Sequence, residues 1–180
     1  MSQAAVARPA VRWRLGAGAR KGVLLIHIAS AGAWLGVDVV MAVLVFRALL
    51  TDDGRAKALS FRALELIAVG PLLACGLLCL LSGILLGLSS RYGLVRYWWV
   101  VVKLVLNLVL TGLVLVALAP EVATHAEQAR QFDAGLTVPL EVGQLIFPPI
   151  VSPTTLLVAM LLAIFKPWGR IRRSGRPGTR

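Results

Sequence analysis

Residues 22–45 read GVLLIHIASAGAWLGVDVVMAVLV, and His27 and Asp38 are the only ionisable side chains among these 24 positions. About 20 apolar residues suffice for a helix to cross a bilayer, so this run is long enough to span one. A carboxylate near the centre of such a helix costs roughly 2.5–3.5 kcal/mol on membrane-insertion scales. Asp38 therefore needs either a partner or a function inside the membrane.

Three further apolar runs follow, at residues 63–88, 98–119 and 145–165. Each exceeds the roughly 18 residues that indicate a spanning helix. The hydrophobic content of 58% and the mean hydropathy of +0.84 exceed those of ordinary soluble domains. No run alternates apolar and polar residues as the strands of a membrane barrel do. We therefore expect an all-α, polytopic transmembrane four-helix bundle, with residues 21–168 as its membrane domain.

The basic residues are distributed unevenly along the chain. Of 19 lysines and arginines, thirteen lie before the first run, between the second and third runs, or after the fourth. Four others lie between the first two runs, against this trend. The positive-inside rule favours an N-in/C-in orientation in the plasma membrane. We expect the basic tails, residues 1–20 and 169–180, to contact anionic lipids of the inner leaflet, and we expect no nucleic acid partner for the net charge of +11.

Polar and small residues occupy opposite faces of the first run. His27, Trp34 and Asp38 recur at helical spacing and form one stripe, which we expect to face the bundle interior. Gly32 and Gly36 lie on the other side at the spacing that lets two helices approach closely. The sequence therefore predicts packing on both faces, with a second copy of the chain or another membrane subunit as the candidate partner.

The third run carries a polar row of its own, Lys103, Asn107 and Thr111, at successive helical turns. Asn107 and Thr111 match Asp38 best in depth, whereas an ion pair with Lys103 would require its long stem to reach outward. The alternatives are structural: Lys103 can extend to the inner interface, and His27 can donate to a neighbouring carbonyl. Interhelical hydrogen bonds of this kind contribute only about 0.6 kcal/mol each on average.

Haem and metal sites have little support in the sequence. The two histidines are His27 and His125, and His125 falls in the outer link, residues 120–143, across the membrane from His27. One chain therefore cannot supply two axial histidines, and haem would need a dimer or another ligand. The outer link holds acidic neighbours of His125 in no recognised metal-ligand spacing, so we expect a solvated surface helix over residues 121–132. These neighbours are Glu121, Glu127 and Asp133.

Other local patterns concern helix geometry and cysteine chemistry. Gly70-Pro71 predicts a kink in the second span, because proline lacks the backbone N–H. Pro148, Pro149 and Pro153 predict that the outer end of the fourth span is extended or broken before Thr154. Cys75 and Cys79 lie one helical turn apart, a spacing that favours packing over a disulfide. We expect no cofactor, no bound metal and no catalytic residue.

Several segments resemble a family of small actinobacterial four-span membrane proteins to which no activity is assigned. The likeness rests on residues 25–36 (LIHIASAGAWLG), on RYGL at 91–94 with WWV at 98–100, on Lys103-Leu104, and on FKPWG at 165–169. The His-x6-Trp-x-Gly pattern of the first span is also distantly similar to copper-resistance D-type membrane proteins. This chain lacks the Met- and His-rich outer segments that copper handling would imply.

Three functional readings follow from the sequence. The first is a non-enzymatic scaffold or accessory subunit, in which the polar stripe holds helices together. The second is a transport component for a proton, a metal or a small solute that uses Asp38 and His27. The third is a haem- or quinone-linked membrane redox protein. We expect the first and exclude no other on sequence alone.

Overall fold

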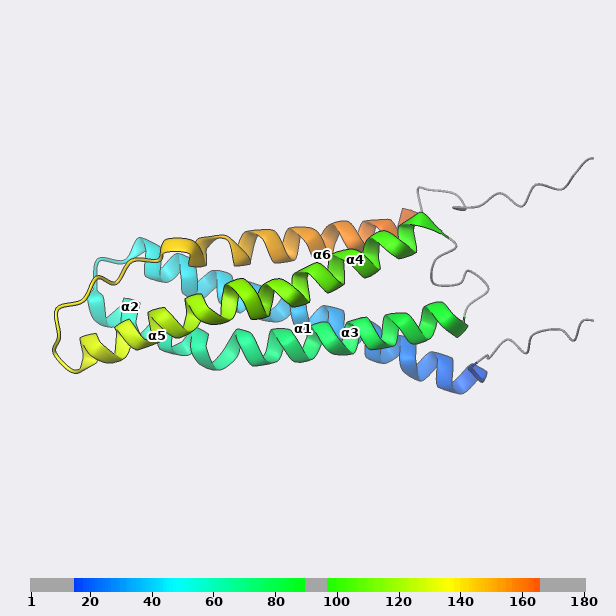
Figure 1. The fold of residues 1–180 in the computed structure, drawn as a ribbon, viewed down its shortest axis with the longest axis horizontal. Helices are drawn as coiled ribbons and strands as arrows, with labels where there is room; N and C mark the ends of the chain where they lie inside the picture. Colours follow the sequence, from blue (N-terminus) through cyan, green and yellow to red (C-terminus); the bar gives the residue numbers. More distant parts are fainter. Residues whose placement is uncertain (1–14, 90–96, 166–180) are drawn as a thin grey trace, which may run out of the picture.

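The computed structural model describes residues 15–89 and 97–165, and its long elements are all helices (Figure 1). Most of the predicted basic tails and of the link between the second and third runs lies outside these residues. The helices are α1 (Ala17–Leu50), α2 (Gly54–Ile67), α3 (Val69–Ser89), α4 (Trp98–Leu113), the π-helix η1 (Val114–Leu118), α5 (Ala119–Asp133), the short 3₁₀ helix η2 (Gly143–Ile146) and α6 (Pro148–Phe165).

These elements form four long helices packed side by side. They are α1, α2 with α3, α4 with η1 and α5, and η2 with α6, and each is long and apolar enough to cross a membrane. Ala17 and Phe165 lie at one end of the bundle, here called the tail end, and α2 and α5 form the opposite, head end (Figure 1). The predicted all-α four-helix bundle is confirmed, and each predicted apolar run lies within one of the four helices.

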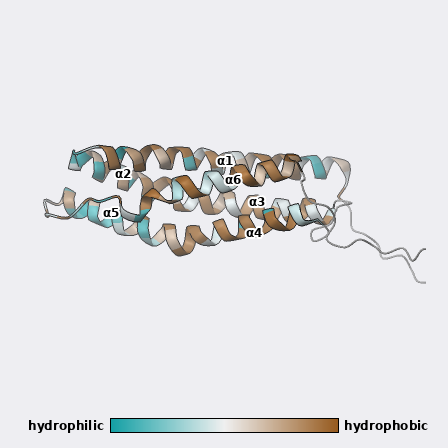
Figure 2. Cartoon of the chain, turned by 90° about the horizontal axis from the view of Figure 1, so that it is seen from above, coloured by the Kyte–Doolittle hydropathy of each residue, from teal (hydrophilic) through white to brown (hydrophobic). Residues whose placement is uncertain are grey.

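The bundle is longer than a membrane is thick. At 1.5 Å per residue the 34 residues of α1 extend about 51 Å, against about 30 Å of hydrocarbon in a typical bilayer. Hydrophilic residues gather at the head end, in α2 and α5, and at the beginning of α1 (Figure 2). Each of the four helices thus contains an apolar stretch long enough for a bilayer, and the hydrophilic head end lies beyond this apolar part of the bundle (Figure 2).

The projecting head end is a small packed unit of its own, made by α2 and α5. Phe61 and Leu64 of α2 and Val122 and Ala126 of α5 are buried in it. Two ion pairs cross its surface: Arg62 Nη1 lies 2.9 Å from Asp133 Oδ2, and Arg130 Nη1 lies 2.8 Å from Glu65 Oε2. Their side chains are half exposed, so each pair contributes at most about 1 kcal/mol.

The predicted helix in the outer link does not lie on the membrane surface. Instead α5 continues α4 in line and stands against α2 (Figure 1). The junction is the π-helical turn η1, which ends two residues before Pro120. Because Pro120 has no N–H to donate to the preceding turn and its ring needs space there, a widened turn accommodates it without ending the helix.

Prolines act differently in the second and fourth long helices. The helix is interrupted at Ala68, three residues before Pro71, as the Gly70-Pro71 pair predicts. The break expected before Thr154 lies at Phe147, between η2 and α6, whereas the proline segment itself is helical from Pro148 and contains Pro153. The N–H groups of a first helical turn have no partner within the helix, so Pro148 and Pro149 cost little there. Pro153 lies inside the helix, where its missing N–H leaves the carbonyl of Pro149 without its usual donor.

Candidate functional site

The polar stripe of α1 faces the other helices. Trp34 and Asp38 are fully buried, and His27 is partly buried nearer the tail end. The same face continues toward the head end with the buried apolar side chains of Met41 and Val45. The helical period of α1 therefore delivers two polar groups, an indole and a carboxylate, to the interior of a bundle with an apolar exterior.

A serine of α6 joins these two groups. The Trp34 indole Nε1–H donates to Ser152 Oγ at 3.0 Å, and the Ser152 hydroxyl donates to Asp38 Oδ2 at 2.8 Å. Because the serine has one hydrogen, accepting from Trp34 and donating to Asp38 fixes the direction of the chain. Trp34 and Asp38 are one helical turn apart, so together they hold the Ser152 hydroxyl between them and tie α1 to α6.

Three buried side-chain oxygens have no hydrogen-bond partner among the described residues: Asp38 Oδ1, Asn107 Oδ1 and Thr111 Oγ1. A buried polar oxygen without a partner costs roughly 1–3 kcal/mol, so such atoms are rare in well-packed proteins. All three belong to the residues that the sequence placed in one polar network. They are the part of this network that the helices do not satisfy among themselves.

Gly76 of α3 fixes the relative positions of Trp34 and Thr111. A Cβ at Gly76 would lie 2.6 Å from Thr111 Oγ1 and 2.8 Å from Cζ3 of Trp34, so a larger residue would collide with both. The Thr111 hydroxyl and the tip of the Trp34 ring therefore meet beside Gly76, and Asp38 follows Trp34 by one turn on α1. The hydrogen bonds expected from Asp38 to Asn107 or Thr111 are not formed among the described residues: Asp38 accepts from Ser152, and the side-chain oxygens of Asn107 and Thr111 have no partner there.

His27 is held by α3. Its Nδ1 lies 3.0 Å from the carbonyl oxygen of Cys79 and 3.0 Å from Ser82 Oγ. The Ser82 hydroxyl is 2.5 Å from the Leu78 carbonyl, which takes its hydrogen. A carbonyl can only accept, so this network assigns the ring hydrogen to Nδ1, donated to Cys79. His27 is a packed histidine that donates to a neighbouring backbone, one of the two readings left open above.

Lys103 extends toward the tail end. Its Nζ lies 4.7 Å from the centre of the Trp99 ring, one turn before it on α4, within the range of a cation–π contact. The salt bridges among the described residues do not join Lys103 to Asp38. The ion pair considered from the sequence is therefore not formed, since the stem points away from Asp38 and toward the nearer interface.

Gly32 and Gly36 are exposed, and a Cβ at either would meet nothing within 4 Å. No described helix of this chain packs on that face of α1. The expectation that α1 packs on both faces is thus fulfilled on one face only within a single chain.

Cys75 and Cys79 are both free thiols, with Cys79 buried. The Cys79 sulfur lies 3.7 Å from His27 Nδ1, beside the hydrogen bond that His27 makes to the carbonyl of the same residue. The two cysteines contribute to the α1–α3 contact as packing groups.

His125 belongs to the head end and is part of its core. Its Nδ1–H donates to the Glu121 carbonyl at 2.7 Å, and its ring packs edge-on against Phe61 with centroids 5.0 Å apart. Of the acidic side chains near it, Glu121 lies closest, with Oε2 3.8 Å from His125 Nδ1. Glu127 pairs instead with Arg130, and Asp133 with Arg62. The described residues contain no group of three or more side chains placed to hold a metal ion.

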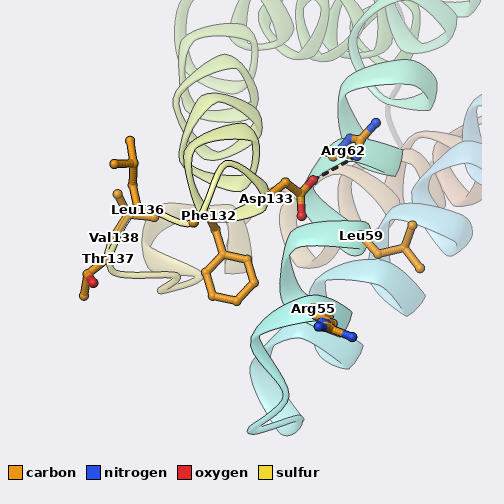
Figure 3. Close-up of a pocket in the computed structure, with 9 residues that line it drawn as sticks. Arg55, Leu59, Arg62, Phe132, Asp133, Leu136, Thr137 and Val138 are labelled. Carbon is orange, nitrogen blue, oxygen red and sulfur yellow. Dashed lines mark hydrogen bonds and ion pairs between the residues drawn. The ribbon is translucent and has the colours of Figure 1, made fainter.

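A groove at the head end lies between α2 and the segment that follows α5 (Figure 3). The Arg62–Asp133 ion pair crosses it, and Phe132 closes one side, with its ring over Gly54, where a Cβ would be only 2.7 Å away. The groove contains none of the intramembrane residues named above. It is a consequence of how α2 meets α5.

Comparison with known proteins adds no identification, because no family model, curated protein or solved structure matches the chain. The structure therefore assigns the protein to a class only: a multi-pass α-helical bundle with four membrane-spanning helices and a buried polar network. Two members of the network, Ser152 and Gly76, were missed from the sequence. Ser152 is a polar residue inside an apolar run, which was the signal available, but the neighbouring prolines suggested an irregular segment instead.

Proposed function

We propose that this protein is a non-enzymatic scaffold or accessory subunit of the plasma membrane, with both termini in the cytoplasm. The main support for the proposal is that the polar side chains of α1 form hydrogen bonds to the neighbouring helices. Trp34 and Asp38 bond to α6 through Ser152, and His27 bonds to α3. These are contacts between helices, and in membranes such contacts supply the specificity that the hydrophobic effect cannot.

The exposed small-residue face of α1 is where a partner helix would pack. Gly32 and Gly36 lie there with open space around them. A second copy of this chain or another membrane subunit would bring its backbone close to α1 at this face, which is how small residues promote association in lipid. The basic tails would hold the tail end against the anionic inner leaflet.

The partner face is tested with the double variant Gly32→Leu/Gly36→Leu. The control is Gly112→Leu on α4, where a Cβ likewise meets nothing within 4 Å. The native masses of the complexes are measured after extraction from the membrane in mild detergent. We expect the wild type and the control to retain a defined complex that the double variant loses. A wild type that runs as a lone monomer, or a complex unaffected by the double variant, would contradict the proposal.

Orientation is tested separately by attaching a reporter to the C-terminus. A fluorescent protein folded in the cytoplasm should fluoresce there, and alkaline phosphatase, which is active only outside, should be inactive. The positive-inside distribution of thirteen basic residues supports this outcome. An active phosphatase fusion with a dark fluorescent fusion would reverse the orientation.

A further inference from the structure

The three unpaired oxygens form a file along the bundle. Asn107 and Thr111 are one turn, about 6 Å, apart on α4, and Asp38 is the same step beyond Trp34 on α1, whose ring lies beside Gly76 together with the Thr111 hydroxyl. A water molecule that makes two hydrogen bonds of about 2.8 Å spans such a step.

The hydroxyl of Thr111 departs from the behaviour of its neighbours. The hydroxyls of Ser60, Thr124 and Thr155 each donate to the backbone carbonyl one turn before them. Thr111 makes no such bond, and its Oγ1 points instead to Gly76 and the Trp34 ring. Ser152 likewise turns from its own helix to donate to Asp38. Both hydroxyls are thus directed into the network at the cost of the local bond.

Beyond Asp38, the bundle interior is apolar toward the head end, whereas polar side chains continue toward the tail end. On the head side of Asp38 the interior is apolar, with Met41, Leu72 and Leu145 each only 1% exposed. On the tail side lie Thr111 and Asn107, followed by the His27 level of the bundle. Polar groups therefore lead from Asp38 in one direction only.

Asp38 has no compensating charge. The nearest ionisable groups that the surrounding helices present are His27 on α1, Cys75 and Cys79 on α3, and Lys103 on α4, whereas α6 carries none. The arginines, lysine and glutamate of α2 lie in the projecting head end. An ionised carboxylate with one hydrogen bond and no counter-ion is too costly in such a place, whereas the neutral acid is tolerated.

We propose that Asp38 is an intramembrane proton-binding site, occupied as the carboxylic acid and reached from the tail end along Thr111 and Asn107. Ser152 donates to Oδ2, so the acid hydrogen resides on Oδ1, the oxygen without a partner among the described residues. A sodium ion would need five or six oxygens around it, and the immediate surroundings offer Oδ1 and a serine oxygen that is already used. This site goes beyond a scaffold role, and the two can fail independently.

The first test uses the native chain in lipid nanodiscs and the apolar reagent dicyclohexylcarbodiimide. The reagent adds to protonated carboxyl groups in apolar surroundings and stays attached as an N-acylurea, so the modified peptide gains the mass of the reagent. We expect the adduct on Asp38 and not on Glu65, which is paired with Arg130 outside the membrane. The Asp38→Asn variant should lack it. No adduct at Asp38, together with a carboxylate rather than a carboxylic acid band in the infrared spectrum that Asp38→Asn removes, would overturn the proposal.

The second test concerns the path. The infrared band of the Asp38 acid shifts when its hydrogen exchanges for deuterium, and the rate of this shift is measured in Thr111→Val and Asn107→Leu. Removing one relay group should slow exchange about tenfold, the equivalent of one lost hydrogen bond. The matched control is Thr155→Val, whose hydroxyl is bonded to its own helix at 2.8 Å. Equal exchange rates in all of these variants would overturn the assigned path.

Discussion

Ser152 donates its hydroxyl hydrogen to Asp38 at 2.8 Å, although the two residues are 114 positions apart and lie in the first and last long helices. Trp34 donates to the same serine from one turn below Asp38. The first and fourth helices are thus joined by three residues in one directed chain of hydrogen bonds. Removing the middle member affects two buried groups at once.

The variant Ser152→Ala should destabilise the bundle by about 1–3 kcal/mol, because it leaves the Trp34 N–H and the remaining Asp38 oxygen without partners. Stability is measured as the unfolding free energy in bicelles by titration with a denaturing detergent. Thr154→Ala provides the control, since the Thr154 hydroxyl is exposed and bonds only to its own helix. A Ser152→Ala variant as stable as this control would show that the bond contributes nothing.

The variant Gly76→Ala should cost about 1–3 kcal/mol, since the added methyl group would collide with Thr111 and with the Trp34 ring. At Gly112 the same change meets open space, and there alanine should be neutral or stabilising because of its higher helix propensity. Both variants are compared in the same unfolding assay. The account of the α3 contact fails if the two substitutions have equal effects.

Arg130 controls the titration of Glu127 at the head end. Its hydrogen bond lowers the pKa of Glu127 below the ordinary value, with a smaller contribution from the Gln131 amide. A lowered folded pKa stabilises the protein above the unfolded pKa, and that contribution is lost as the pH falls through the folded value. Arg130→Gln should therefore raise the pKa of Glu127 toward normal and leave stability at neutral pH nearly unchanged, since both groups are exposed. Carbon-13 NMR titration of the Glu127 carboxyl group measures this, and an unaltered pKa would contradict it.

The helical period explains why the fold was predictable from the sequence. The apolar runs predicted the four helices. The 3.6-residue repeat identified Trp34 and Asp38 as interior residues, because it determines on which face of its own helix a side chain lies. The same rule does not say which residue of another helix lies opposite. Ser152 was missed for that reason, and the expected bond from Asp38 to Thr111 is not formed, since the Thr111 hydroxyl lies beside Gly76 and the Trp34 ring.

The effect of a proline on a helix depends on where in the helix it lies, and the sequence alone did not define the helix boundaries around Pro148, Pro149 and Pro120. Pro148 and Pro149 were read as helix breakers but occupy a first turn, where their missing N–H groups have no helical partner to lose. The sequence places the end of the third apolar run at residue 119, directly before Pro120, yet the helix continues through the widened turn Val114–Leu118 and past Pro120 into α5. In both cases the outcome depends on backbone adjustments of a few residues, which local sequence signals do not specify.

The most direct test of the account is a double-mutant cycle between Asp38→Val and Ser152→Ala, measured as unfolding free energies in bicelles; valine has no oxygen to accept the Ser152 hydroxyl. The bond between these residues is the centre of the polar network, and coupling energies of hydrogen bonds in membranes reach about 1.7 kcal/mol. We predict a coupling near 1 kcal/mol, so that the double variant is more stable than the sum of the single effects implies. Additive effects, within about 0.3 kcal/mol, would contradict the account.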